Sequence, residues 1–224
     1  MFEEIYRDTK LLKDKRFVLE QMYQRRMSFE PTWQLLSRYI VPYRGRFHER
    51  GGSMDGERRD LYLIDPYPMD AAGKCAAGLQ SGLTSPSRPW FELSLADQEK
   101  AEYHSVRQWL DDVRDVMMAV YARGNTYAML YDIEAELCQF GTAAALMMQD
   151  YDTALWHRSY TCGEYAGGVD ARGRLYSFGR RFELTALQMV AEFGIDNVSV
   201  AVKTAYNNND HTQRFEVEML IVKN

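Results

Sequence analysis

Hydrophobic positions recur at helical spacing through the first two-thirds of the chain and then change to shorter, partly alternating runs. Helical spacing covers residues 2–27, 28–42, 71–83, 97–123 and 126–138, with Ser28 as a cap between the first two segments and proline or glycine at the later breaks. Strand-like runs follow at residues 143–148, 155–160, 164–166, 175–182 and 213–222. The pattern predicts an α+β fold, with a helix-rich N-terminal half followed by a small mixed or antiparallel β region that contains short helices.

Two short segments near the C-terminus are predicted as helices. Thr185 stands where an N-cap belongs, and residues 186–193 form an apolar stripe that Gly194 closes. Residues 198–206 alternate as a strand would, but their position also fits a helix, and we interpret them as a helix. We divide the chain into a helical arm with an exposed loop (1–60), a helical core (61–142) and a mixed β/α portion (143–224).

The helix predicted over residues 71–83 consists largely of alanine and glycine, which lets a neighbouring backbone approach closely. We therefore expect it to be tightly packed. The segment Arg88-Pro89-Trp90-Phe91 follows a proline-interrupted loop, and we expect its aromatics to be anchored in the core. Trp109 belongs to the stripe of the next helix that we expect to be buried. These five residues are our candidates for structural or interface positions.

The segment from Tyr43 to Asp60 combines glycines with arginines and shows no apolar period, which predicts a long exposed loop. A solvated charged loop is the simpler interpretation. If the loop binds a partner, phosphate groups are the natural ligands of its arginines. The candidates are Arg44, Arg46, Arg50, Arg58 and Arg59.

The net charge of −5 argues against a broad basic surface for nucleic acid, although it does not exclude contact with DNA. The three cysteines, Cys75, Cys138 and Cys162, are far apart in sequence and are predicted to be reduced thiols, with Cys75 and Cys138 buried. No membrane-length apolar run and no signal-peptide core occurs, so we expect no membrane partner and synthesis in the cytoplasm.

No arrangement of residues predicts a reaction. The four histidines have no neighbour at metal-ligand spacing, and Gly73-Lys74 lacks the remaining residues of a phosphate loop. The acidic pairs Glu134/Glu136 and Asp111/Asp112 are interpreted as solvated helix faces. We therefore expect no enzyme, no catalytic residue, no metal and no cofactor, while an unrecognised hydrolase or nuclease stays open.

A set of short motifs, in a fixed order, resembles the head-to-tail connector, or portal, proteins of short-tailed bacteriophages. The order begins with Trp33, Leu36, Tyr39 and Pro42, and passes through the Gly- and Arg-rich loop to Leu61-Tyr62 and Asp65. It continues with Leu83-Thr84-Ser85-Pro86, Arg88-Pro89-Trp90-Phe91, Leu93, Trp109-Leu110, Gly124-Asn125-Thr126-Tyr127, Phe140-Gly141-Thr142-Ala143-Ala144, Glu164-Tyr165, Arg181-Phe182, Leu184-Thr185 and Glu192-Phe193-Gly194. Each motif alone is weak, but the ordered set covers nearly the whole chain.

The resemblance implies a ring of twelve identical subunits at one capsid vertex, in the virion, after assembly in the host cytoplasm. Double-stranded DNA would pass through the ring non-specifically during packaging and ejection. The implied partners are the terminase packaging motor and the capsid, scaffolding and tail adaptor proteins. Family members are considerably longer, so we expect this chain to supply the outer, wing-like body and to lack the family's C-terminal half. A monomeric or capsid-associated adaptor that keeps the fold without a channel is the alternative.

Overall fold

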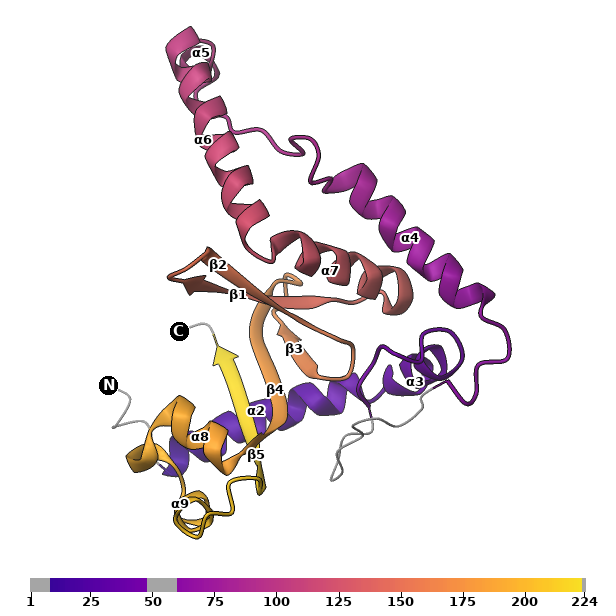
Figure 1. Cartoon of the computed structure of the whole chain (residues 1–224), viewed down its shortest axis with the longest axis vertical. Helices are drawn as coiled ribbons and strands as arrows, with labels where there is room; N and C mark the ends of the chain where they lie inside the picture. Colours follow the sequence, from indigo (N-terminus) through magenta and orange to yellow (C-terminus); the bar gives the residue numbers. More distant parts are fainter. Residues whose placement is uncertain (1–8, 48–59, 223–224) are drawn as a thin grey trace. The chain divides into compact units, whose positions relative to one another are not determined.

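The computed structural model describes residues 9–47 and 60–222, which fold as two compact units. Unit 1 joins the two ends of the chain, residues 1–31 and 163–224, and unit 2 is the continuous stretch 32–162. Unit 1 contains α2 (Thr9–Arg26), β3 (Tyr165–Val169), β4 (Leu175–Thr185), α8 (Ala186–Phe193), the 3₁₀ helix η1 (Ile195–Asn197), α9 (Val200–Asn207) and β5 (Arg214–Val222) (Figure 1). Unit 2 contains α4 (Tyr67–Leu83), α5 (Gln98–Ala101), α6 (His104–Arg123), α7 (Thr126–Phe140), β1 (Ala144–Asp150) and β2 (Ala154–Tyr160).

Helix α3 (Glu30–Tyr39) begins just before the boundary and continues into unit 2. The predicted α+β class is confirmed, with the helices concentrated before residue 143 and antiparallel strands after it. The segment 198–206, where strand and helix competed, contains α9. Its N-cap Ser199 accepts a hydrogen bond from the Val202 N–H, which supports the helical alternative.

Unit 1 is built on a three-stranded antiparallel sheet in the order β3-β4-β5, with α2 packed against it. The apolar stripe of α2 supplies Leu19 and Met22, both almost completely buried. Gly179 on β4 makes this contact possible, because a Cβ at that position would collide with Leu19 Cδ1. The absence of a side chain on the strand therefore sets how closely the helix approaches the sheet.

Charged side chains also fix α2 on the sheet. The Arg181 guanidinium on β4 binds Glu20 of α2 at 2.8 Å and Glu218 of β5 at 3.1 Å. Its backbone N–H donates to the Tyr23 hydroxyl at 3.0 Å. Burial works to lower the pKa of Arg181, but the bonds to Glu20 and Glu218 outweigh it and raise the pKa.

A second apolar cluster of unit 1 lies around α8 and α9. Helix α8 has the bounds that the sequence predicts, with a capping box between Thr185 and Gln188 and Gly194 at its end. The cluster consists of Ala186, Val198, Val202 and Ala205, with Met189, Val190 and Phe215 packed against it. The short helices thus complete the unit on the C-terminal side of β4.

Unit 2 is organised around α7, which contacts α4, α6 and the antiparallel hairpin β1-β2. Its main apolar cluster contains Val41, Phe140 and Cys162, with Trp33, Leu36, Ile40, Phe47 and Ala72 packed against them. Helix α7 ends at Gly141 in the left-handed conformation, as a glycine C-cap should.

Two predictions about the helices of unit 2 are wrong. Helix α4 is not tightly packed: of its residues only Ala76 is buried, and Gly73, Gly78 and Gly82 have open space where a Cβ would stand. The long helix over 97–123 is divided into α5 and α6, because Tyr103 takes an extended conformation before α6 begins. In α4 the pattern identified the helix but not its exposure, and in 97–123 it identified the helix but not the break at Tyr103.

Candidate functional site

The segment that follows α3 carries the arginine that organises unit 2. Gly45 adopts a left-handed φ of 85°, and a Cβ there would lie 2.6 Å from the Phe47 ring. Glycine is therefore required for the turn. The turn directs Phe47 into the apolar cluster beside Trp33 and Phe140, while the Arg44 side chain points toward α7. The backbone up to Phe47 is thus held at several points.

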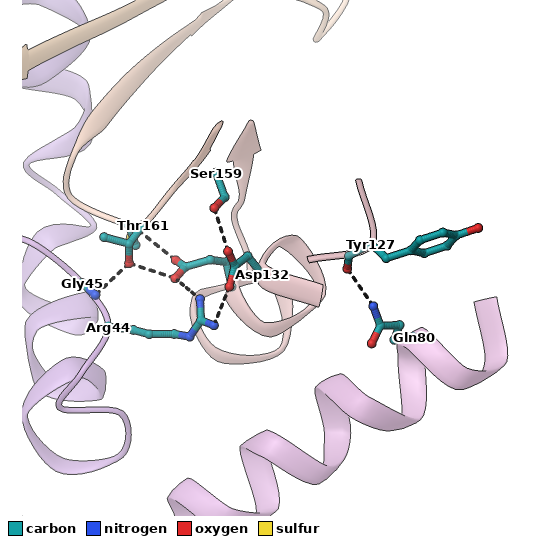
Figure 2. A network of polar contacts seen from close by, with 9 residues as sticks. Arg44, Gly45, Gln80, Tyr127, Asp132, Ser159 and Thr161 are labelled. Atoms are coloured by element: carbon teal, nitrogen blue, oxygen red, sulfur yellow. Dashed lines mark hydrogen bonds and ion pairs between the residues drawn. The ribbon is translucent and has the colours of Figure 1, made fainter. Parts of the chain in front are cut away.

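Arg44 binds two carboxylates of α7, as Figure 2 shows. Its Nη1 lies 3.1 Å from Glu136 Oε1, and its Nη2 lies 3.0 Å from Asp132 Oδ1. The two acids stand one turn apart on the helix, so one planar guanidinium reaches both. Burial works to lower the pKa of Arg44, but the two carboxylates outweigh it and raise the pKa above its ordinary value.

Glu136 is the centre of this network, with a side chain only 2% exposed. Besides the Arg44 guanidinium, its carboxylate accepts the Thr161 hydroxyl at 2.8 Å and the Cys162 N–H at 2.9 Å. Thr161 in turn accepts the Gly45 N–H at 2.8 Å (Figure 2). A buried carboxylate with three donors is fully satisfied, so the network fastens the 41–47 segment and the end of β2 to α7.

The interpretation of Glu134 and Glu136 as solvated is wrong. Both are buried in the helix, and Glu134 accepts a hydrogen bond from the Thr84 hydroxyl at 2.8 Å. The Ser159 hydroxyl donates to Asp132 Oδ2 at 2.8 Å, so Asp132, Glu136, Ser159 and Thr161 belong to one network that reasoning from the sequence missed. The available signal was the four-residue spacing of Asp132 and Glu136 on a mostly apolar helix, together with an arginine beside a glycine turn.

A second turn fixes the junction of α6 and α7 on β2. Asn125 accepts the His157 N–H at 2.8 Å and donates to the His157 carbonyl at 2.6 Å, and the Thr126 hydroxyl lies 3.0 Å from His157 Nε2. A Cβ on Gly124 would lie 2.9 Å from the Leu155 carbonyl, so glycine is needed for the close approach. Burial lowers the pKa of His157, which favours the neutral imidazole.

The structure describes two of the five arginines of the predicted phosphate-binding loop. Arg44 is bound to Asp132 and Glu136, and Arg46 is exposed while its backbone N–H donates to the Cys162 carbonyl at 2.9 Å. Arg50, Arg58 and Arg59 lie outside the described residues. The structure thus assigns the Arg44 guanidinium to an internal contact.

The Trp90-Phe91 segment forms an aromatic cluster with Tyr121 of α6. The ring centroids of Trp90 and Phe91 are 4.9 Å apart, and those of Trp90 and Tyr121 are 6.4 Å apart. Both residues of the segment are half-buried, so the expectation of a fully buried anchor was too strong. Arg88 and Pro89 are exposed, and the Arg88 guanidinium donates to the Gly82 carbonyl at 3.0 Å, near the end of α4.

Trp109 does not lie in the buried stripe of α6, where the sequence placed it. Its side chain is 59% exposed, and Val116, two helical turns later, is 64% exposed. Leu110 is the buried residue of this helix. Residues seven apart share a helix face, so Trp109 and Val116 form an exposed apolar strip beside the covered one.

The cysteines also differ from the prediction. Cys75 on α4 is exposed, Cys138 on α7 is half-buried, and Cys162 is the fully buried one. Within residues 9–47 and 60–222, no group of histidine, cysteine and acidic side chains has the arrangement of a metal site. No helix in that part of the chain has the length and apolar character to span a membrane.

Comparison with known proteins gives a consistent family. Residues 13–224 match the model of the bacteriophage head to tail connecting proteins. A probable portal protein of Bordetella phage BPP-1 is 37% identical over 187 residues, which cover 84% of this chain and 34% of that protein. The portal protein of Salmonella phage epsilon15 is 35% identical over 206 residues, which cover 92% of this chain and 37% of that protein.

The chain therefore spans little more than a third of the length of these relatives. The family match nevertheless runs from α2 to the end of β5 and includes both units. It also agrees with the resemblance that the ordered motifs carry. The chain belongs to the bacteriophage head to tail connecting protein family.

Proposed function

We propose that this chain is a subunit of a portal ring at the capsid vertex, through which double-stranded DNA is packaged and ejected and to which the tail attaches. The match of residues 13–224 to the connector family carries the proposal. Similarity to two phage portal proteins supports it. The role is mechanical: the ring binds its neighbours and guides a polymer, and it is not an enzyme.

A closed ring of identical subunits requires two different patches on each subunit, since every copy meets one neighbour with each patch. The strip of Trp109 and Val116 on α6 supports one such patch, because both side chains are large, apolar and mostly exposed. Aromatic side chains are enriched in the buried centre of protein interfaces. We assign Trp109 to the contact between subunits, in a ring of twelve subunits.

The cluster of Trp90, Phe91 and Tyr121 holds α6, the helix that carries this patch. It joins the segment after α4 to the last part of α6 and so limits the movement of the helix. Arg88 and Pro89 belong to this segment, and the Arg88 bond to the Gly82 carbonyl holds it near the end of α4. Arg88, Pro89, Trp90 and Phe91 position the patch, while Trp109 contacts the neighbouring subunit.

The charge of the chain supports passage of DNA without tight binding. At a net charge of −5, a ring of such subunits is strongly acidic, and acidic walls repel the phosphate backbone so that the duplex slides. The arginines of the loop, Arg46, Arg50, Arg58 and Arg59, would contact phosphate or an acidic partner locally. The terminase motor and the capsid, scaffolding and tail adaptor proteins complete the assembly at the virion vertex, which forms in the host cytoplasm.

The experiment that tests this proposal is native mass spectrometry of the purified chain, combined with electron micrographs of the same sample. We expect closed rings for the native sequence. Trp109→Glu should shift the population toward monomers, because the substitution puts a charge into an apolar contact. Arg107→Glu is the matched control: it introduces the same side chain at an exposed position of α6 on another face and should leave the rings intact.

Two results would contradict the proposal in different ways. A native chain that stays monomeric at every concentration would reject the ring function for this length of chain, and would favour the adaptor alternative. Rings that form equally well with Trp109→Glu would keep the ring but reject the assignment of Trp109. The circular dichroism of each variant shows whether the fold itself has changed.

A further inference from the structure

Two cysteines from different helices of unit 2 lie in contact. Cys75 on α4 and Cys138 on α7 place their sulfur atoms 2.8 Å apart. A disulfide needs about 2.05 Å between the sulfurs, so a movement of less than about 1 Å would suffice to form the bond. The residues are far apart in sequence, so the bond would join two separate elements.

We propose that Cys75 and Cys138 are a redox modification site that forms a reversible intramolecular disulfide with a low-molecular-weight disulfide as the oxidant. Two observations carry the inference: the contact of the two sulfurs and the exposure of Cys75, through which the oxidant can enter. The third thiol, Cys162, is 1% exposed and packs with Val41 and Phe140, so it takes no part.

The surroundings of the pair give the two thiols different roles. Burial raises the pKa of Cys138 to about 11, and the contact with Cys75 and the charge of Glu134 act in the same direction. Cys138 therefore remains a thiol at neutral pH, while the thiolate is the form that attacks a disulfide. Exposed Cys75 is the residue that reacts first, and Cys138 is the resolving thiol.

The reaction balances in two exchange steps. The Cys75 thiolate attacks one sulfur of the oxidant, a mixed disulfide forms, and the first thiol of the oxidant leaves with a proton from solvent. The Cys138 thiol then gives its proton to solvent as its sulfur attacks the Cys75 sulfur, the mixed bond breaks, and the second thiol of the oxidant leaves with a proton from solvent. The protein loses two protons and two electrons, which together are two hydrogen atoms, and the oxidant is reduced to two thiols.

Disulfide formation would change how α4 is held. In the reduced chain, polar contacts connect α4 and the residue after it to α7: Gln80 donates to the Tyr127 carbonyl at 2.8 Å (Figure 2), and Thr84 donates to Glu134. Since Ala76 is the buried residue of α4, these contacts are easily opened. The disulfide would make the attachment covalent. The thiols would stay reduced in a reducing cell, and the disulfide would form in an oxidising medium.

The test is incubation of the native chain with oxidised glutathione, followed by alkylation of the remaining thiols, proteolysis and mass spectrometry. We expect a cross-linked peptide that contains Cys75 and Cys138, and a chain mass lower by two hydrogen atoms. Hydrogen exchange should slow about tenfold or more in α4 after oxidation, because local opening no longer separates it from α7. Dithiothreitol should reverse both changes.

Single variants separate the roles of the two cysteines. Cys138→Ser should stop at a glutathione adduct on Cys75, and Cys75→Ser should take up little glutathione. Cys162→Ala is the control and should form the Cys75–Cys138 disulfide as the native chain does. In the native chain, a stable adduct on Cys75 without the cross-link, or a bond between two chains, would overturn the proposal. This peptide map does not depend on whether a variant folds.

Discussion

Replacement of Arg44 by alanine tests whether the network around Glu136 holds unit 2 together. The substitution removes the bonds to Glu136 Oε1 and Asp132 Oδ1, and leaves Glu136 with two donors, the Thr161 hydroxyl and the Cys162 N–H. The carboxylate is then a buried charge without a counter-charge. We expect a substantial loss of stability confined to unit 2.

The magnitude follows from the burial of the partners. Removal of one partner of a buried ion pair costs about 3–5 kcal/mol in general. Arg44 keeps 25% of its side chain exposed, so water screens part of the effect and places the expected loss near the lower limit, about 3 kcal/mol. Asp132, at 39% exposure, adds only about 0.5 kcal/mol. Arg44→Lys keeps the charge but not the fork of donors, and should lose about 1–2 kcal/mol.

Urea denaturation followed by tryptophan fluorescence measures this loss selectively, because all four tryptophans lie within residues 32–162. We expect the midpoint to fall while the slope stays constant. Arg107→Ala, which removes an exposed arginine from the same unit, should change the free energy of unfolding by less than about 0.5 kcal/mol. If Arg44→Ala costs no more than this control, the network does not stabilise the unit and the reasoning is refuted.

Three further predictions follow from other contacts. Gly179→Ala should lower the free energy of unfolding by about 2 kcal/mol and speed hydrogen exchange of α2, because the new Cβ meets Leu19. Gly78→Ala, whose Cβ meets open space on a helix, should raise the free energy of unfolding by up to about 1 kcal/mol. Equal effects of the two substitutions would contradict the packing of α2 on Gly179. Trp90→Ala should cost about 2 kcal/mol in urea denaturation, since the ring is half-buried, and a loss near zero would show that its cluster carries no stability. The folded-state pKa of His157 is lowered, so its contribution to stability should be fully present above about pH 6.5 and be lost as the pH falls below that value. The urea midpoints at about pH 7.5 and 5.5 should therefore differ less in His157→Gln than in the native chain. A difference as large as that of the native chain would exclude His157 as the cause.

Local patterns predicted the elements well where capping and periodicity act within a few residues. The α8 helix with Thr185 and Gly194, and strand β5, follow directly from such signals. Buried polar residues were not predictable in this way. Glu136 looks like any surface acid until the fold brings Arg44 and Thr161 to it, because the charge is buried only through partners that are distant in sequence.

The same limit explains the errors on the helices. Trp109 and the glycines of α4 have the composition of a buried face, but no element within the described part of the chain covers them. Apolar composition predicts that a surface is to be covered, and it does not say by which chain. Cys75 and Cys138, which the sequence treats as unrelated, are brought together only by the contact of α4 with α7.

The division of unit 1 between the two ends of the chain has a consequence for synthesis on the ribosome. Helix α2 is made first, but its partners β3, β4 and β5 follow only after all of unit 2. Unit 2 is continuous and can fold as soon as Cys162 has emerged, while Leu19 and Met22 still expose their apolar side chains. The apolar face of α2 therefore stays uncovered by its sheet until β5 has been made.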